Sequence, residues 1–337
     1  MQSWSLSQPN GLSSLINTNL PPPITKDNEV QIKVHAVGLN PIDYKLTDWG
    51  YATWNYPQII GLDIAGVIEQ VGKEISTFKV GDRVFGFLDP RQAGGFAEYV
   101  SCKPDALSHI PPHVLYSDAA ALPCAGFTAW IALKDKLRLP PKSIIAITGA
   151  GGGVGGFAVQ LAKIMGLTVY AIAETHHHQR LLGYGADAAI DPNDNVGLKI
   201  LELTEARLLD AVIDCVSSKT ASIMSALIRY NEQLVMIADQ FQQIPILATT
   251  KAISIHEVAL HGTYAHGTLE HIQHLSMVGE QLMTLLENHQ LNPMIDKIFP
   301  FSELPQGLNY LQQNHHQGKV VVSLIDEPQI KKQPQRC

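Results

Sequence analysis

A cluster of glycines near the middle of the chain has the residue types and spacing that most directly suggest chemistry. An apolar, β-branched run at 143–148 leads into Gly149-Ala150-Gly151-Gly152-Gly153-Val154-Gly155-Gly156, and a helix-forming segment follows at 157–163. A dinucleotide-binding βα turn requires strand, glycine turn and helix in this order. The glycines let the backbone approach a pyrophosphate, whose charge is favoured by free N–H groups and the helix N-terminus. Two registers fit the spacing: G-x-G-x-x-G at Gly151, Gly153 and Gly156, or G-x-x-G-x-x-G at Gly149, Gly152 and Gly155.

The composition is that of a compact globular protein with room for two domains. The chain has 337 residues, of which 45% are hydrophobic and 16% charged. Its net charge of −7 gives no reason to expect nucleic acid or an acidic membrane as a partner. The N-terminal residues lack a signal-peptide pattern, and no apolar run approaches the roughly 20 residues that span a bilayer. The cysteines show no C-x-x-C pair and no disulfide spacing, which is typical of a reducing cytoplasm. They are Cys102, Cys124, Cys215 and Cys337. We therefore expect a soluble, cytoplasmic protein.

Turn signals divide the first part of the chain into short strands. Strands are predicted at 29–37, 61–72, 81–87 and 94–100, and a short helix follows Pro41. These strands indicate a β-rich, barrel-like first domain. A helix capped by Ser117 is predicted at 117–123, and a buried helix at 127–133. Residues 1–28 are polar, and the prolines at 21–23 disfavour a helix there.

Strands and helices alternate after the glycine turn. Strands are predicted at 167–173, 188–190, 210–216 and 233–238, and helical segments at 179–183 and 219–230. This alternation implies a parallel sheet with helices on both faces. Farther along, helices are predicted at 271–288 and 302–312, and strands at 295–299 and 318–324. The polar tail at 326–337 is expected to fray.

Taken together, these segments resemble the zinc-independent, quinone oxidoreductase-like branch of the medium-chain dehydrogenase/reductase family. The matching segments are 38–45, 61–72, 81–86, 94–100, 122–130, 148–163, 185–191, 210–216 and 318–322. The resemblance implies an α/β fold, with a GroES-like β-barrel catalytic domain and a Rossmann domain whose parallel sheet is doubly wound. It places the catalytic domain at 1–122, the nucleotide-binding domain at 123–264, and a return to the catalytic domain at 265–337. The active site would lie in the cleft between the domains, and the family pattern favours the register Gly149, Gly152 and Gly155.

The resemblance also implies that this chain holds no metal. Zinc-dependent relatives bind a catalytic zinc through a Cys, a His and a second Cys. At the first two positions this chain has Asn40 and Leu62, and only Cys124 matches a ligand. The four cysteines of the structural zinc lobe are missing as well. The adjacent histidines at 176–178 and 315–316 more often face solvent than share a metal.

Without a Lewis acid, the acceptor must be one that a hydride can reach with modest assistance. Quinones and activated α,β-unsaturated carbonyls meet that condition because conjugation spreads the arriving charge. By resemblance, Asn40, Asp43 and Tyr44 line the nicotinamide end of the cleft. Tyr44 is predicted as the proton donor or oxygen anchor and Asn40 as a polar contact; alternatively, Asp43 caps the short helix and Tyr44 only packs. Aromatic residues at 48–57 could stack on a quinone or pack under the barrel.

Further residues are predicted to contact the cofactor besides the glycine turn, from Gly149 to Gly155. They are Thr128, whose hydroxyl could instead bond the preceding helical turn, Cys215 and Ala238 at strand ends, and Lys319 in a Gly-Lys turn. Glu174 stands about 20 residues after the turn, where an acidic residue would hold the ribose of NAD. By resemblance, however, Ala173 takes the acidic position of the family register, and Glu174 lies one step beyond it. Against that, the branch mostly uses NADPH, and Arg180 with the nearby histidines could meet a 2′-phosphate. The sequence therefore predicts NADPH, with NADH open.

Other functions remain open at this point. An enoyl-thioester reductase of the same superfamily would fit, as would a protein that binds NADPH without turnover and serves as a redox sensor or interaction partner. The physiological acceptor is not specified. The oligomeric state is also open: by resemblance, relatives are often dimers joined through their Rossmann sheets, and the apolar run 253–260 is a candidate edge for a homodimer.

Overall fold

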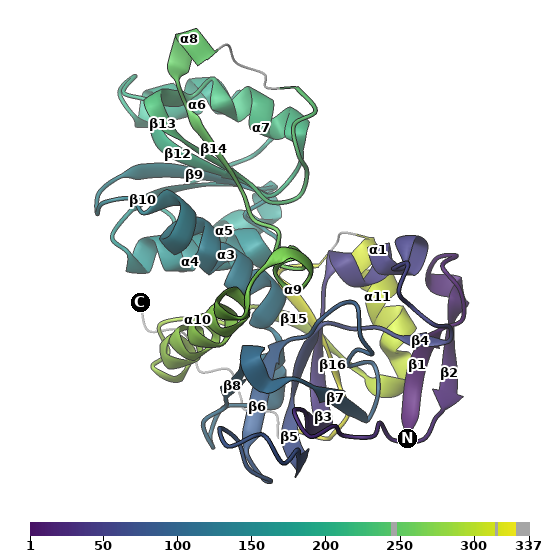
Figure 1. Cartoon of the computed structure of the whole chain (residues 1–337). Coiled ribbons are helices and arrows are strands. Elements are labelled where there is room, and N and C mark those ends of the chain that lie inside the picture. The colour runs from purple at the N-terminus through teal and green to yellow at the C-terminus, as the bar shows by residue number, and fades with distance from the viewer. Residues whose placement is uncertain (244–247, 314–315, 328–337) are drawn as a thin grey trace.

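The computed structural model describes residues 1–243, 248–313 and 316–327, which form two lobes (Figure 1). One lobe is built on a six-stranded parallel sheet with the strand order β11-β10-β9-β12-β13-β14. These strands are β9 (Ile144–Thr148), β10 (Thr168–Ile172), β11 (Ala188–Ile190), β12 (Leu209–Asp214), β13 (Ile228–Met236) and β14 (Ser254–Glu257). The chain winds outward from β9 in both directions, so the sheet is doubly wound. The predicted α/β fold class is confirmed.

Helices cover both faces of this sheet because neighbouring residues of a strand point to opposite sides. In β9, Ile145 and Ile147 pack into one apolar core, whereas Ala146 packs into another. Figure 1 shows α4 and α5 on the first face and α6 and α7 on the second. These helices are α4 (Gly153–Ile164), α5 (His178–Gly183), α6 (Val196–Leu203) and α7 (Ser218–Ser225).

The other lobe contains a seven-stranded sheet with the order β15-β16-β3-β5-β6-β8, and β7 pairs with β3. Its strands are β3 (Val30–Leu39), β5 (Asp63–Val71), β6 (Arg83–Phe87), β7 (Tyr99–Cys102), β8 (Leu107–His109), β15 (Ile295–Pro300) and β16 (Lys319–Ser323). β16 lies antiparallel to β3, so the end of the chain returns to the lobe in which it began. This topology agrees with the expected interruption of a barrel by a parallel sheet; the exact domain boundaries stay a prediction.

The helices outside the parallel sheet connect or cover the lobes. A continuous helical segment of mixed π and α geometry leads from the barrel toward β9. It consists of η3 (Pro123–Phe127), α3 (Thr128–Trp130) and η4 (Ile131–Leu137). The others are α1 (Pro41–Trp49), α2 (Tyr116–Ala120), α8 (Ala248–Lys251), α9 (Gly262–His266), α10 (Leu269–Glu287) and α11 (Leu304–Gln312). Short 3₁₀ turns are η1 (Leu12–Ser14), η2 (Pro104–Ala106), η5 (Thr175–His177) and η6 (Phe301–Glu303). No helix of the described residues is long and apolar enough to cross a bilayer.

A three-stranded sheet at the N-terminus was not predicted. Its order is β2-β1-β4, with β1 (Gln2–Leu6), β2 (Leu15–Asn19) and β4 (Gln58–Ile59). The polar sequence of this segment did not suggest strands, because two of the residues that β1 buries completely are serines, Ser3 and Ser5. Both hydroxyls lie 2.8 Å from Oγ1 of Thr18, so the buried serines are paired across the hairpin.

Two helix predictions need correction. The predicted helix at 219–230 ends at Ser225, because Ile228 already pairs with Leu209 of β12. Ser117 does not cap α2, which begins at Tyr116. Its first amides instead donate to the carboxylate of Glu327, from Tyr116 N at 2.6 Å and Ser117 N at 3.0 Å. The rest of the tail that was expected to fray lies outside the described residues.

Loss of the Glu327 carboxylate is expected to destabilise the fold. Glu327→Ala leaves two helix N-terminal amides without their partner, at a cost of about 1–2 kcal/mol in the free energy of unfolding. Urea denaturation measures the change, with the exposed neighbour Asp326→Ala as the control. Equal stability of the two variants would show that the carboxylate does not cap α2.

Candidate functional site

The glycine turn connects β9 to α4 at the carboxyl edge of the parallel sheet. Gly149 has φ +62°, a left-handed conformation that favours glycine. A Cβ on Gly155 would collide with the carbonyl oxygen of Gly149, so helix and turn approach at backbone distance. At Gly152, the cap of α4, the nearest atom to an added Cβ is Gly149 O at 3.5 Å, which leaves its surface open. Backbone geometry thus requires glycine at positions 149 and 155, whereas a Cβ at position 152 would meet no protein atom closer than 3.5 Å.

The ends of the neighbouring strands meet the turn at the same edge. The Asp214 carboxylate accepts hydrogen bonds from Thr148 Oγ1 at 2.7 Å and from the amide of Val216 at 3.0 Å. This carboxylate fixes the loop that carries Cys215, whose thiol pKa is raised by burial. Ala238 follows β13 at the same edge. The strand ends predicted to touch the cofactor are therefore brought together beside the glycine turn.

The segments that follow β10 and β11 are acidic. The Glu174 side chain is 66% exposed and lies 3.4 Å from His176 Nδ1. Beside it, Asp191 accepts hydrogen bonds from the hydroxyl and amide of Thr175, at 2.6 and 2.9 Å, and those bonds contribute to lowering its pKa to about 2. Burial, together with neighbouring His176 and other cationic groups, lowers the pKa of His177 to about 4, so its ring is neutral at pH 7. The Glu174 carboxylate thus stands where the ribose end of a dinucleotide is expected, and Asp191 nearby is bonded by Thr175 and Asn193.

Arg180 links the glycine turn to the segment before β16 through hydrogen bonds. Its guanidinium donates to the carbonyl of Gly151 at 2.9 Å and to that of Gln317 at 2.7 Å. It also lies 3.0 Å from His177 Nδ1. Two of its nitrogens are thus committed to holding the turn against the segment that precedes β16.

On the barrel side, Asn40 and Asp43 form the N-terminal cap of α1. The amide of Asn40 donates to Asp43 Oδ2 at 2.8 Å, and the two side chains make a capping box. Both residues are buried, with 2% and 0% exposure. The capping alternative considered for Asp43 is therefore what the structure contains. Tyr44 next to them is half-buried, and burial raises its pKa.

Asp63, which the sequence did not single out, joins this cap to the rest of the site. Its Oδ2 accepts from Asn40 Nδ2 at 2.8 Å, and its Oδ1 accepts from the amide of Cys124 at 2.9 Å. Lys319 Nζ lies 3.5 Å from Asp63 Oδ2 and donates to Asn40 Oδ1 at 2.5 Å. Lys319, predicted as a cofactor contact, is only 3% exposed and forms an ion pair with a fully buried carboxylate.

These residues do not fit a zinc ion. The side-chain amide of Asn40 is held by Asp63 and Lys319, and Leu62 is a buried apolar residue. Burial, with the charge of Asp63, raises the pKa of Cys124 well above its ordinary value, so this thiol is a poor source of thiolate. Among the described residues, no group of three or more His, Cys, Asp or Glu side chains has a geometry that could hold a metal.

Other predicted site residues have structural partners. The hydroxyl of Thr128 donates to the carbonyl of Cys124 at 2.7 Å, which is the bond to the preceding helical turn. In the aromatic segment, Trp54 is 8% exposed and its Nε1 donates to the carbonyl of Pro90, whereas Trp49 is 65% exposed. The segment is thus divided between packing and exposure. Cys102, Cys124 and Cys215 are free thiols, and Cys337 and His315 lie outside the described residues.

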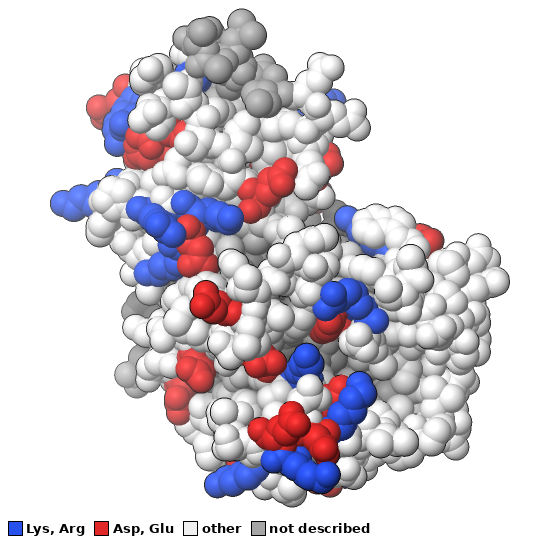
Figure 2. Space-filling view, viewed as in Figure 1, with Lys and Arg blue, Asp and Glu red and all other residues white. Residues whose placement is uncertain are grey.

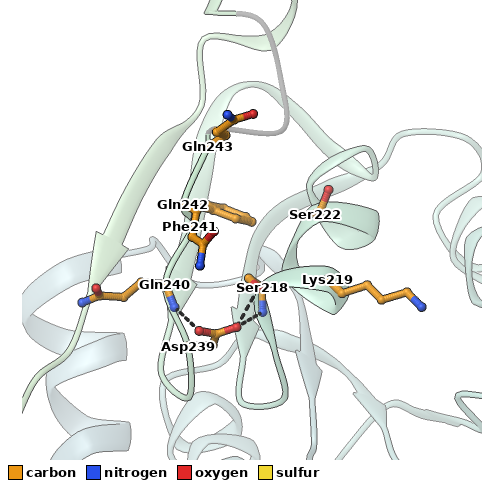
Figure 3. Close-up of a pocket in the computed structure, with 8 residues that line it drawn as sticks. All are labelled: Ser218, Lys219, Ser222, Asp239, Gln240, Phe241, Gln242 and Gln243. Atoms are coloured by element: carbon orange, nitrogen blue, oxygen red, sulfur yellow. Dashed lines mark hydrogen bonds between the residues drawn. The ribbon is translucent and has the colours of Figure 1, made fainter.

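A polar pocket of about 330 Å³ lies beside the loop that follows β13 (Figure 3). It is lined by Ser218, Lys219, Ser222, Asp239, Gln240, Phe241, Gln242 and Gln243. The Asp239 carboxylate accepts from the hydroxyl of Ser218 at 2.6 Å and from its amide at 3.0 Å, so it caps α7. Those bonds, with a smaller effect of Lys45 on α1, lower the pKa of Asp239. On the molecular face in Figure 2, acidic and basic residues are interspersed over both lobes.

Comparisons with known proteins agree with this geometry. Residues 26–112 match the alcohol dehydrogenase GroES-like domain family, and residues 153–278 match the zinc-binding dehydrogenase family. The quinone oxidoreductase of Sus scrofa is 32% identical over 292 residues, covering 84% of this chain and 85% of that protein. The chain belongs to the quinone oxidoreductase-like branch of the medium-chain dehydrogenase/reductase superfamily.

Other members of the family align along most of their length. A chloroplastic quinone oxidoreductase of Triphysaria versicolor is 30% identical over 93% of this chain and 94% of its own. The mitochondrial NAD(P)H oxidoreductase RTN4IP1 of Mus musculus is 28% identical over 90% of this chain and 84% of its own. The quinone oxidoreductase from Coxiella burnetii has a TM-score of 0.82 at 27% identity, covering 96% of this chain and 99% of that one. The predicted family is confirmed, and the chain is an oxidoreductase of an NAD(P)H-dependent family.

The family assignment allows a matched test of the glycine turn. Gly152→Ala adds a methyl group that meets only Gly149 O, at an ordinary van der Waals distance of 3.5 Å. The free energy of unfolding is therefore expected to change by less than about 0.5 kcal/mol while NADH affinity falls. Gly155→Ala forces two backbone segments apart and is expected to cost about 1–3 kcal/mol of stability. Urea denaturation and NADH fluorescence titration separate the two effects. If Gly152→Ala bound NADH with wild-type affinity, the glycine turn would not be part of the cofactor site.

The buried carboxylates give the stability a defined pH dependence. Burial, with the charge of Asp63, raises the pKa of Asp43 to about 8, and burial raises that of Asp63 to about 6. Between about pH 4 and 8 the folded state therefore holds more protons than the unfolded state, and stability falls as pH rises. Asp43→Asn is expected to flatten this fall in urea midpoints measured from pH 5 to 8. The exposed Asp27→Asn is the control, and an unchanged slope in Asp43→Asn would contradict the assignment.

Proposed function

We propose that this protein transfers a hydride from NAD(P)H to a quinone or an activated α,β-unsaturated carbonyl without a metal. The observation that carries the proposal is the pairing of an open glycine turn with a barrel site whose cation is Lys319 and whose residues do not suit zinc. The printed names of the Sus scrofa and Triphysaria versicolor relatives support the acceptor class.

The chain's own residues would position the reactants and supply a proton. Reduced nicotinamide, when bound, supplies the hydride. We assign the proton donor to the phenol of Tyr44, because it is half-buried on α1 next to the fixed cap, and burial keeps it protonated. Asn40 and Asp43 are engaged in the cap, and Asn40 also bonds Asp63, so we assign them the role of holding α1 in place. The exposed ring of Trp49 remains available at the end of the same helix.

The charge at the ribose end favours NADH over NADPH, contrary to the sequence-based expectation. That expectation rested on the family branch, which mostly uses NADPH, and on Arg180 with the nearby histidines as phosphate ligands. The guanidinium of Arg180 instead holds two backbone carbonyls. Glu174 presents an exposed carboxylate, which suits a ribose diol and repels a 2′-phosphate. The Asp191 carboxylate is bonded by Thr175 and Asn193 and adds negative charge nearby. We therefore propose NADH as the preferred cofactor. Location in the cytoplasm stays a prediction, since relatives include proteins named as mitochondrial and chloroplastic.

Cofactor preference is tested by titrating NADH and NADPH into the purified protein. We expect tighter binding of NADH, and Glu174→Ala should narrow the difference by improving NADPH affinity several-fold. Glu202→Ala, on α6, is the control and should leave the ratio unchanged. If the wild type bound NADPH more tightly than NADH, the proposed preference for NADH would be refuted.

The activity is tested by following NADH and NADPH oxidation across a panel of quinones, enones and enoyl thioesters. We expect turnover with quinones or enones that 1,10-phenanthroline leaves unchanged, and Tyr44→Phe should lower kcat about tenfold to a hundredfold. Tyr230→Phe, at a 70% exposed position, is the control. Oxidation only with enoyl thioesters would favour that alternative, and cofactor binding without any oxidation would favour a non-catalytic role.

A further inference from the structure

Packing of the barrel alone does not account for the buried ion pair between Lys319 and Asp63. Asp63 is fully buried and Lys319 is 3% exposed, and a buried ion pair is rarely a net gain in stability over apolar residues. Three elements meet at the pair: β5 carries Asp63, β16 begins with Lys319, and Asn40 caps α1. Nζ of Lys319 also donates to the carbonyl of Leu39 at 3.2 Å, so it satisfies the backbone just before the cap.

The same lysine touches the cofactor side. A Cβ on Gly153, the first residue of α4, would lie 3.2 Å from Lys319 Cδ. Two residues earlier, the carbonyl of Gln317 accepts from Arg180, which also holds Gly151. The segment 317–319 therefore lies between the glycine turn and the cap of α1. The aliphatic part of the Lys319 side chain lies near the glycine turn, and its ammonium group lies in the barrel beside Asp63.

We propose that Lys319 is a positioning residue: its ammonium supplies the fixed positive charge that a metal ion would otherwise provide beside Asp63, and its side chain sets α1 against the cofactor turn. This inference rests on the proposed function for its effect on turnover. In this arrangement the ammonium compensates the Asp63 carboxylate and orients the Asn40 amide, which starts the helix that carries Tyr44. The residues facing the pair are Leu39, Asn40, Asp43 and Cys124.

A double-mutant cycle distinguishes this role from simple packing. Lys319→Met and Asp63→Asn each leave one buried group without its charge partner, whereas the combined variant is neutral. We expect Lys319→Met to lower kcat at least tenfold and to weaken NADH binding at least threefold, with the KM for the quinone changed less than threefold. The combined variant should recover much of both losses, and Lys319→Arg should lose less than Lys319→Met.

The exposed pair Lys73 and Asp27 is the matched control. Its side chains are 85% and 57% exposed, so Lys73→Met, Asp27→Asn and their combination should all behave like the wild type. Urea denaturation is run on all six variants and on Lys319→Arg, to compare stability with function.

The outcomes separate the two proposals. A folded Lys319→Met variant with wild-type kcat and NADH affinity would overturn the positioning role. The role would also be overturned if the fold-losses of kcat and NADH affinity in the combined variant equalled the product of the losses in the two single variants. If the single variants fail to fold, the combined variant and Lys319→Arg decide, since both avoid an uncompensated charge. If the wild type binds NADH but reduces no acceptor, the proposed function fails, and the role of Lys319 is judged on NADH affinity alone.

Discussion

A carboxylate without access to water requires partners, and in this protein that constraint is concentrated at Asp63. The amide of Asn40, the backbone N–H of Cys124 and the ammonium of Lys319 supply them. Each partner arrives from a different element, so the requirement of one side chain fixes α1, η3 and β16 around the start of β5. The barrel half of the site is organised by this carboxylate rather than by a metal-binding motif.

The parallel sheet meets that centre through the glycine turn. Because the strands are parallel, the carboxyl ends of β9, β12 and β13 come together at one edge, where doubly wound sheets bind ligands. Arg180 fixes the turn to residue 317, two positions before Lys319. Charge compensation in one lobe and backbone geometry in the other are thus joined by a short stretch of the returning chain.

Local patterns were predicted well from the sequence, and distant pairings were not. The glycine turn was recognised because strand, glycines and helix are contiguous, and β11 was placed exactly at 188–190. Ser117 looked like a helix cap, but the partner of that helix is Glu327, far along the chain. Likewise Asp63 carries no signal of its own in the sequence, since its importance comes from three partners that only folding brings together. Arg180 was expected to meet a 2′-phosphate, and its bonds to the carbonyls of Gly151 and Gln317 could not be foreseen because Gln317 lies far along the chain.

The late position of Lys319 has a consequence for biosynthesis. The strands of the parallel sheet form one uninterrupted stretch, from Ile144 to Glu257, and can pair while the ribosome is still adding the remainder. The barrel cannot, since Asp63 is synthesised before the parallel sheet and Lys319 after it. Until β16 has been added, the Asp63 carboxylate lacks the ammonium that compensates it. Assembly of the Asp63 site therefore waits for a strand that is made after the whole parallel sheet.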